Sequence, residues 1–279
     1  MNSMYLRFPG GKSKALTFSY DDAVEQDMRL VEIFRSTGMR ATFNVNAGQI
    51  PPEGTVHPEG TIHRRMTQSQ ILKTYTEDVC EVACHSYEHP HLTACSSAVA
   101  CNQIIEDRKA LEKLFNRPIH GMAYPYGPTN DTVVEICRLC DIYYSRTTVS
   151  TKNFDMPTDW LRLPATCHHK NPDLMELAQR FINLNATRLP QLFYVWGHAY
   201  EFEQHDNWHI IEEFCQKMSG KDDIWYATNM EIYTAWADYM RLETSADGSM
   251  IFNPNCRSVW IANSRNQIFQ IQPGETLRT

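Results

Sequence analysis

The sequence predicts an α/β fold built around a mainly parallel sheet. Short β-prone runs alternate with amphipathic helical segments up to about residue 243, the order typical of strand–helix–strand units. The run at 192–196 is strongly apolar, as expected for a buried strand. Polar residues suited to chemistry follow directly after several of these runs.

The predicted elements follow one another in a regular order. Strands are expected at 14–20, 40–45, 79–84, 120–124, 142–145, 161–163 and 192–196. Helices are expected at 25–36, 67–75, 96–115, 131–140, 172–183, 208–218 and 229–241. The segment 49–60 is rich in Pro and Gly, which predicts a loop.

The pattern changes after about residue 243. Short β runs separated by turns occur at 249–252, 258–261 and 267–271. We therefore expect a main domain over residues 1–243 and a small β appendage over residues 244–279, packed on the main domain.

Composition excludes several classes of protein. Lys and Arg total 26 against 33 Asp and Glu, a net charge of −7, and no basic run is present, so nucleic acid is not an expected partner. No stretch approaches the roughly 20 apolar residues that cross a bilayer, so no membrane partner is expected. The nine cysteines are scattered and the N-terminal residues show no apolar secretion signal; we expect reduced thiols in a cytoplasmic protein.

Candidate catalytic residues lie at the ends of four predicted strands. They are Asp21 and Asp22, then His85 and His89, then the segment 125–127, then His198. Because the carboxyl ends of parallel strands meet at one edge of a sheet, these groups are expected to converge there.

The histidines and aspartates have the chemistry of a metal hydrolase. One helical turn would place His85 and His89 on the same face, and with one carboxylate they form a 2-His-1-carboxylate site. A cation held there lowers the pKa of bound water towards ~7 and polarises a carbonyl oxygen. Asp21 and Asp22 point to different sides if the backbone is extended, so one can bind metal while the other takes a proton.

The order of these motifs resembles a known family. The chain carries Thr-Phe-Ser-Tyr-Asp-Asp at 17–22, His-Ser-Tyr-Glu-His at 85–89, Tyr-Pro-Tyr-Gly at 124–127, and His198. Over roughly residues 14–240 it resembles the polysaccharide deacetylase (NodB homology) family, carbohydrate esterase family 4. The resemblance implies a distorted, incomplete (β/α) barrel and a divalent ion, zinc most of all, with cobalt or another transition metal as alternatives.

The resemblance also implies a reaction and a role for each matching residue. The reaction is removal of an N-acetyl or other N-acyl group from a carbohydrate, by attack of metal-activated water on the amide. Asp21 would be the general base, and the backbone N–H of Tyr126 would hold the oxyanion. His198 would be the general acid. The metal ligands would be Asp22, His85 and His89.

The chain departs from the family pattern in the first and third motifs. Ser19 and Tyr20 interrupt the usual Thr-Phe-Asp-Asp-Gly, and Ala23 replaces its glycine. Ala123 stands where the family carries an arginine that pairs with the catalytic base. Arg162, expected at the end of another strand, is a candidate to reach in and replace that arginine.

Several further residues are candidates for the site. Tyr200, Phe202 and Trp160 are aromatic residues near predicted strand ends that could stack on a sugar ring. His91 is an alternative metal ligand. His168 and His169 either line the site or form a solvated loop pair.

Two alternative functions remain open from the sequence. One is hydrolysis of a small cyclic amide or ureide, as in allantoinase-like members of the same superfamily, which the missing arginine keeps open. The other is a non-catalytic sugar-binding protein on an enzyme scaffold. The sequence does not determine the sugar, the chain length, the metal, the oligomeric state or the role of the β appendage.

Overall fold

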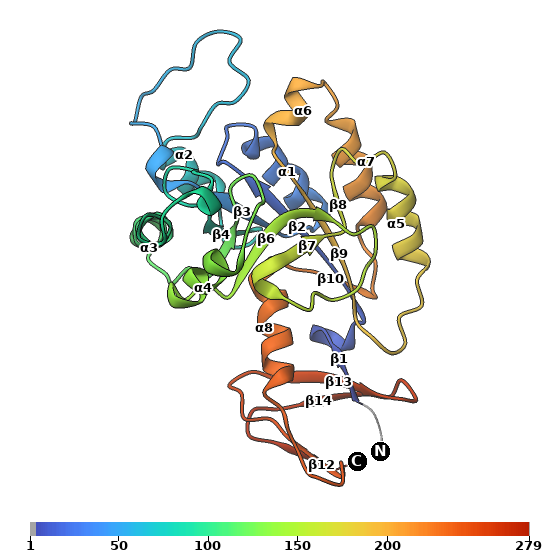
Figure 1. Cartoon of the computed structure of the whole chain (residues 1–279). Coiled ribbons are helices and arrows are strands. Elements are labelled where there is room, and N and C mark those ends of the chain that lie inside the picture. The colour runs from blue at the N-terminus through green and yellow to red at the C-terminus, as the bar shows by residue number, and fades with distance from the viewer. Residues whose placement is uncertain (1–3, 279) are drawn as a thin grey trace.

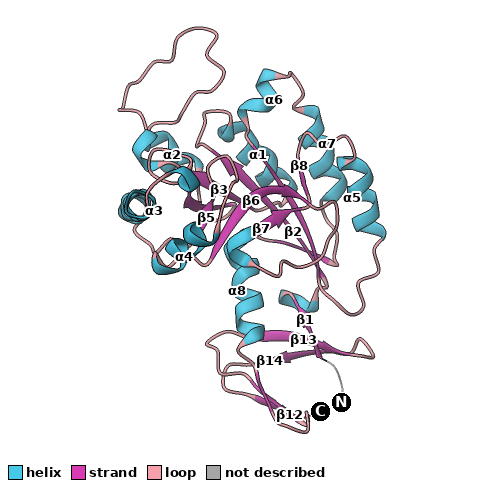
Figure 2. Cartoon of the chain, viewed as in Figure 1, coloured by secondary structure: helices cyan, strands magenta, loops and turns pink. Residues whose placement is uncertain are grey.

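The structure, a computed structural model, describes residues 4–278 and confirms the predicted α/β fold. Its centre is a nine-stranded sheet in which every paired strand runs parallel to its neighbour. Helices lie around the outside of this sheet (Figure 2). In sheet order the strands are β7 (Leu163–Ala165), β6 (Tyr144–Ser150), β5 (Gly121–Ala123), β4 (Cys80–Cys84), β3 (Ala41–Val45), β2 (Lys14–Asp21), β9 (Gln191–Gly197) and β8 (Cys167–His168), with β10 (Ile224–Tyr226) beside β2.

The sheet curls into an incomplete barrel. Its two outermost strands, β7 and β8, are separated in the chain by a single residue, Thr166. The backbone N–H of Thr166 donates to the carbonyl of Tyr194 in β9 at 2.8 Å, while β7 pairs with β6 at the other edge. The two edges therefore approach each other, yet the strand pairing stays open, as expected of a distorted (β/α) barrel.

Side-chain alternation in β2 sets one carboxylate inside the barrel. Phe18 and Tyr20 face outward and pack on Phe34 of α1, with ring centroids 4.5 and 6.0 Å apart. Because successive side chains of a strand point to opposite faces, Ser19 and Asp21 face the interior. The flanking helices are α1 (Asp27–Thr37), α2 (Gln68–Thr74), α3 (Ser97–Phe115), α4 (Asp131–Leu139), α5 (Leu174–Asn183), α6 (Tyr200–Gln204), α7 (His209–Met218) and α8 (Asn229–Met240).

One predicted strand is wrong. Residues 160–162 form a 3₁₀ turn, capped by the Asp159 side chain, which accepts from the Leu161 N–H. The strand β7 begins only at Leu163. This shifts Arg162 from the carboxyl end of a strand to the amino end of one.

The C-terminal strands form two small antiparallel sheets below α8 (Figure 1). One contains β11 (Glu243–Thr244), β12 (Met250–Phe252) and β15 (Thr276–Arg278). The other contains β13 (Val259–Asn263), β14 (Ile268–Ile271) and, unexpectedly, the N-terminal strand β1 (Met4–Arg7). Strand β1, which the sequence assigned to the main domain, thus pairs with β13 of the appendage.

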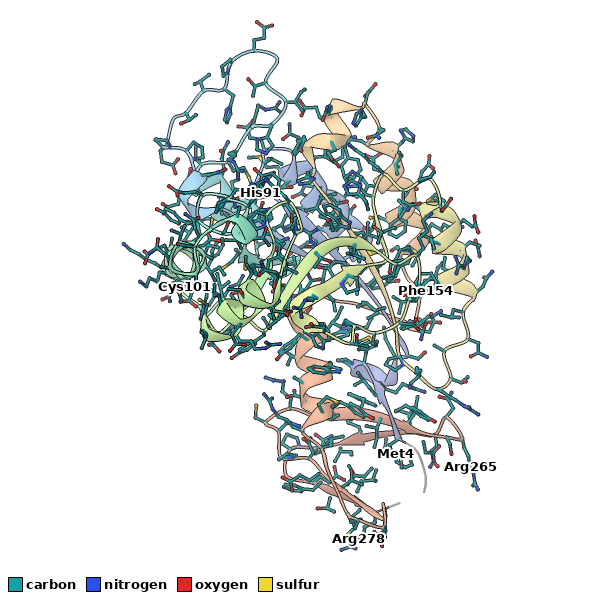
Figure 3. The ribbon with its side chains drawn as sticks, viewed as in Figure 1. Met4, His91, Cys101, Phe154, Arg265 and Arg278 are labelled. Atoms are coloured by element: carbon teal, nitrogen blue, oxygen red, sulfur yellow. The ribbon has the colours of Figure 1, made fainter. Side chains whose placement is uncertain are left out.

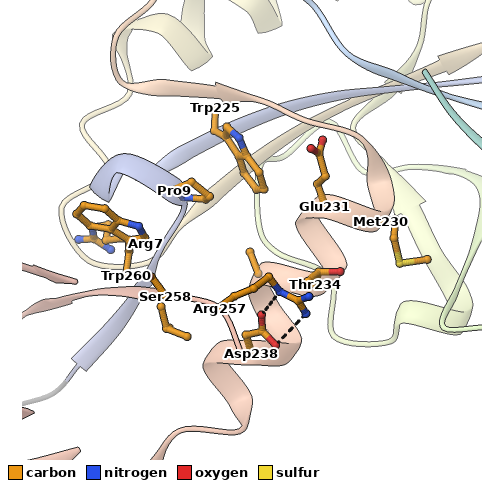
Figure 4. Close-up of a pocket in the computed structure, with 12 residues that line it drawn as sticks. Arg7, Pro9, Trp225, Met230, Glu231, Thr234, Asp238, Arg257, Ser258 and Trp260 are labelled. Atoms are coloured by element: carbon orange, nitrogen blue, oxygen red, sulfur yellow. Dashed lines mark hydrogen bonds and ion pairs between the residues drawn. The ribbon is translucent and has the colours of Figure 1, made fainter. Parts of the chain in front are cut away.

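A largely apolar cavity of about 230 Å³ lies between α8, β10 and the appendage (Figure 4). Trp225 and Trp260 line it, and an ion pair between Asp238 and Arg257 lies at its edge. Trp225 is in register with Ala15 near the start of β2, so this cavity is at the amino end of the sheet.

All nine cysteines are free. Within residues 4–278, no helix has both the length and the apolar character needed to cross a bilayer.

Candidate active site

The predicted site residues converge at the carboxyl end of the sheet. Asp21 is the last residue of β2, while His85, Tyr126 and His198 follow β4, β5 and β9. His91, in the loop after β4, marks this end in Figure 3, and the labelled residues of the appendage lie at the opposite end of the molecule.

Asp22, His85 and His89 form a compact group that could hold a metal ion. Their ligand atoms all lie within 4.8 Å of one another, and the two imidazole Nε2 atoms are 3.2 Å apart. The Nδ1 of His85 is 2.8 Å from the carbonyl of Ala123. Nδ1 therefore carries the proton, and the Nε2 lone pair faces the group.

The protonation states also fit a metal ligand set. Burial lowers the pKa of His85. Burial and the neighbouring His85 lower the pKa of His89 to about 4. Both rings are therefore neutral near pH 7, the form that binds metal, and with Asp22 they make the 2-His-1-carboxylate donor set of transition-metal sites.

The predicted helical turn between His85 and His89 is wrong, because residues 85–89 form an irregular loop. The two rings meet because the loop backbone enters the left-handed region at Ser86 and His89 (φ 59° and 60°). Such conformations are costly for non-glycine residues and gather at functional sites. Of the ten non-glycine residues with positive φ in the described chain, five are in the strand-end loops of this site: Asp22, Ala23, Ser86, His89 and Tyr126.

Two residues of the long loop before α2 contact Asp22, and sequence reasoning missed both. His63 Nε2 is 3.1 Å from one carboxylate oxygen, and Arg65 Nη2 is 3.2 Å from the other. Arg65 also donates to the backbone carbonyl of Asp22 at 2.7 Å. Burial acts to raise the pKa of Asp22, but His63 and His85 outweigh it and hold the pKa below its usual range.

Asp21 lies between the metal group and His198. Its carboxylate accepts from Arg146 Nη2 at 2.5 Å and from Asn44 Nδ2 at 2.8 Å. One of its oxygens is 3.9 Å from His85 Nε2 and 3.8 Å from His198 Nε2. Burial acts to raise the pKa of Asp21, but Arg146 and His85 outweigh it and lower the pKa, so the group is ionised at neutral pH.

The prediction that Arg162 pairs with Asp21 is wrong. The guanidinium of Arg162 pairs with Asp159 at 2.8 Å and with Asp131 at 2.5 Å, at the amino end of β7. Arg146 takes its place from β6, where it is in register with Ala123 of β5. The cation missing at position 123 is thus supplied by the adjacent strand, a substitution that only the strand pairing reveals.

His198 is held on its other side by Glu201, one turn further along the chain. His198 Nδ1 is 3.6 Å from a Glu201 oxygen. Burial acts to lower the pKa of His198, but Glu201 and Asp21 outweigh it and raise the pKa. A His-x-x-Glu spacing was the available sequence signal for Glu201, and it was overlooked.

Tyr126 follows β5 in a turn with φ 63°. Its ring is 54% exposed, stacks on His91 at 3.8 Å and meets His89 edge-on at 4.5 Å. His91 therefore contacts Tyr126 and is not part of the metal group. The Tyr126 ring forms an aromatic wall beside the metal group.

The prediction that three aromatic residues bind sugar is wrong for two of them. Phe202 is fully buried and stacks on His169, and Trp160 is buried against Trp236 of α8. Tyr200 does border the site, with its ring centroid 5.3 Å from that of His198.

Comparison with known families agrees with this geometry. The family model described as polysaccharide deacetylase matches residues 8–145, which include Asp21, Asp22, His85 and His89. This match confirms the predicted resemblance to the polysaccharide deacetylase family over about the first half of the chain. A comparison with curated protein sequences found no match.

One solved structure with a TM-score above 0.5 shares the fold at low sequence identity, and others are similar to a lesser degree. A putative polysaccharide deacetylase from Mycobacterium smegmatis is 16% identical with a TM-score of 0.58, and the match covers 82% of this chain and 92% of that one. A family 4 carbohydrate esterase from Streptomyces lividans in complex with acetate is 18% identical, with a TM-score of 0.49 and coverage of 76% and 90%. A Streptococcus pyogenes deacetylase in complex with acetate is 22% identical, with a TM-score of 0.42. That last match covers 47% of this chain and 55% of the other, so the chain spans about half of that protein.

Proposed function

Starting from the match to the polysaccharide deacetylase family, we propose that this chain is a metal-dependent hydrolase that removes an N-acetyl or similar N-acyl group from a carbohydrate. The main support for this proposal is the position of Asp21. Its ionised carboxylate lies within 4 Å of an imidazole of the metal group on one side and of His198 on the other. A base placed between a metal group and an acid suits amide hydrolysis.

Asp22, His85 and His89 would hold the divalent ion, and the nitrogen and oxygen donors favour zinc or a similar transition metal. When bound, such an ion increases the acidity of a water molecule and polarises an amide carbonyl. The Nδ1 contact from His85 to the Ala123 carbonyl fixes the ring in the orientation that this role requires.

The remaining steps belong to the protein's own groups. Asp21 accepts the proton of the water that attacks the amide carbon, and Arg146 keeps it ionised for this purpose. The Tyr126 N–H donates to the negative charge that develops on the carbonyl oxygen. His198 gives a proton to the amide nitrogen as the carbon–nitrogen bond breaks, leaving a carboxylate and a free amine.

The alternative of a cyclic amide or ureide hydrolase loses its main support. That alternative was kept open by the alanine at position 123, but Arg146 supplies the missing guanidinium to Asp21. The substrate class still distinguishes the two reactions: acetate release from N-acetylglucosamine oligomers supports deacetylation, and ring opening of a cyclic ureide contradicts it.

The test compares wild type with His85→Ala and a control, His120→Ala. His120 stacks on Tyr143 at the amino end of β5, away from the metal group. We expect elemental analysis to find the transition-metal ion of the Asp22 group (Asp22, His85 and His89), about one per chain in addition to any ion bound elsewhere. We also expect acetate release from N-acetylglucosamine oligomers. Both should be lost in His85→Ala and kept in the control.

A wild-type protein that holds the metal and binds the oligomers without any turnover would favour the non-catalytic sugar-binding alternative. Turnover that survives in metal-free protein would contradict the metal-dependent mechanism.

A further inference from the structure

A second group of potential metal ligands lies beside His198, outside the metal group already described. Glu201 is its centre: His168 Nε2 is 3.2 Å and His169 Nε2 3.0 Å from one carboxylate oxygen. His198 Nδ1 is 3.6 Å from the other oxygen. These side chains come from the end of β8, from the turn after β9 and from the first turn of α6. We refer to His168, His198 and Glu201 as the Glu201 cluster.

Several atoms around Glu201 are buried without a hydrogen bond. Within the described residues, His198 Nδ1, the Glu201 oxygen nearest to His168, and both ring nitrogens of His169 have no partner of acceptable geometry. His168 Nε2 and His169 Nε2 are within 3.2 Å of the Glu201 oxygen, so there the geometry fails by angle, whereas His198 Nδ1 is too far from Glu201, at 3.6 Å, for a hydrogen bond. Buried polar atoms are almost always hydrogen-bonded, and exceptions often mark the place of an ion or water. Ligand atoms directed at a common point, instead of at one another, produce this pattern.

We propose that the Glu201 cluster is a second divalent-cation site, next to the Asp22 group and distinct from it. The ligand atoms of His168, His198 and Glu201 lie within 4.8 Å of one another, as do those of the Asp22 group. Two imidazoles and a carboxylate again select a zinc-like transition ion. The ligands come from separate elements that are fixed by the barrel, so the site is largely pre-formed.

Lys170 compensates the charge of Glu201 when no ion is present. Its ammonium is 3.1 Å from a Glu201 oxygen and is about one-third exposed. A cation entering the cluster displaces this ammonium, and the flexible lysine side chain can turn into solvent. His169 lines the inner side of the cluster, clamped between the rings of Tyr20 and Phe202.

Occupation of this site has a consequence for catalysis, which rests on the proposed function. An acid imidazolium carries a proton on both ring nitrogens. A cation on Nδ1 of His198 uses the lone pair that this proton needs, so His198 cannot take the imidazolium form. The second ion therefore inhibits deacetylation.

The test measures zinc binding and activity together. Chelator-stripped wild type is titrated with zinc by calorimetry and equilibrium dialysis, beside His168→Gln, Asp22→Asn and the control His120→Gln. His168 makes no contact with Asp21 or with the Asp22 group, but it does contact Glu201, so the activity of each variant at saturating zinc is compared with its own activity at low zinc. Thermal unfolding checks that each variant is folded.

We expect wild type and the control to bind two ions, and His168→Gln and Asp22→Asn to bind one each. At saturating zinc, wild type and the control should lose activity, and His168→Gln should keep it. A wild type that binds one ion, or a His168→Gln variant that still binds two, overturns the second site. Two-ion binding that depends on His168, in a protein without deacetylase activity at any zinc level, establishes the site and contradicts the proposed function.

Discussion

Buried carboxylates at the two ends of the parallel sheet have different surroundings. At the carboxyl end, Asp21 is 3% exposed and pairs with Arg146, which is only 1% exposed, while two imidazole nitrogens approach Asp21 to 3.8–3.9 Å without hydrogen bonding. At the amino end, Asp238 is also buried, but the arginine from which it accepts at 2.8 Å, Arg257, has a side chain that is 56% exposed (Figure 4).

The two ends of the sheet also differ in backbone conformation and in packing. Left-handed non-glycine residues gather in the strand-end loops of the carboxyl end, whereas the amino end is closed by apolar packing around Trp225 and Trp260. Strained backbone and incompletely satisfied polar groups cost stability, and proteins keep them where function requires them. We therefore expect substitutions at the carboxyl end to reduce activity, and substitutions at the amino end to reduce only stability.

The largest effect is expected for Asp21→Asn. The amide cannot accept the proton of the attacking water, so kcat/KM for acetate release should fall by about 10²–10⁴-fold. The measurement is steady-state kinetics on metal-loaded protein, with metal content determined in parallel. A variant within a few-fold of wild type would exclude Asp21 as the base.

Arg146→Met should reduce activity by about 10–100-fold, because Asp21 loses the cation that orients it and keeps it ionised. It should also lower the free energy of unfolding by about 3–5 kcal/mol, since a buried carboxylate is left unpaired. Kinetics and urea denaturation measure the two effects.

Arg162→Met is the matched control, because the same change removes only a partly exposed pair with Asp159 and Asp131. It should leave turnover unchanged. Equal losses in the two variants would contradict the assignment of Arg146.

Glu201→Gln should shift the pH dependence of turnover, with a smaller effect on the maximal turnover rate. His198 acts when protonated, so activity is lost as pH rises through its pKa, and Glu201 helps to raise that pKa. Removing the carboxylate lowers the pKa of His198 and moves the basic limb to lower pH. Near neutral pH the loss should be roughly tenfold or less, since one pKa unit changes the protonated fraction tenfold at most. An unmoved basic limb would show that Glu201 does not act on His198.

The smallest effect on activity is expected at the amino end. Asp238→Asn weakens the pairing with Arg257, so the free energy of unfolding should fall by about 1 kcal/mol while kcat and KM stay unchanged. Urea denaturation and steady-state kinetics measure these quantities. A clear loss of turnover would mean that the appendage end contributes to the site and would remove the contrast between the two ends.

The sequence predicted the elements of this site more reliably than their contacts. Strand ends and motif order brought Asp22, His85 and His89 into one group, although the helical turn assumed for the two histidines is a left-handed loop. Arg146 was missed because its role depends on its register with Ala123, a pairing between strands. Phe202 was misplaced because its burial depends on His169, which is far from it in the chain.

The sequence by itself determined the alternation of strands and helices, the strand-end location of the site and the family it resembles, because periodicity and motif order are local properties. The tertiary structure decided which arginine reaches Asp21, which loop contacts Asp22 and that the first strand pairs with β13. It also brought His168 beside His198 and Glu201. These are contacts between segments distant in the chain, and they depend on strand register and loop path, which no local pattern encodes.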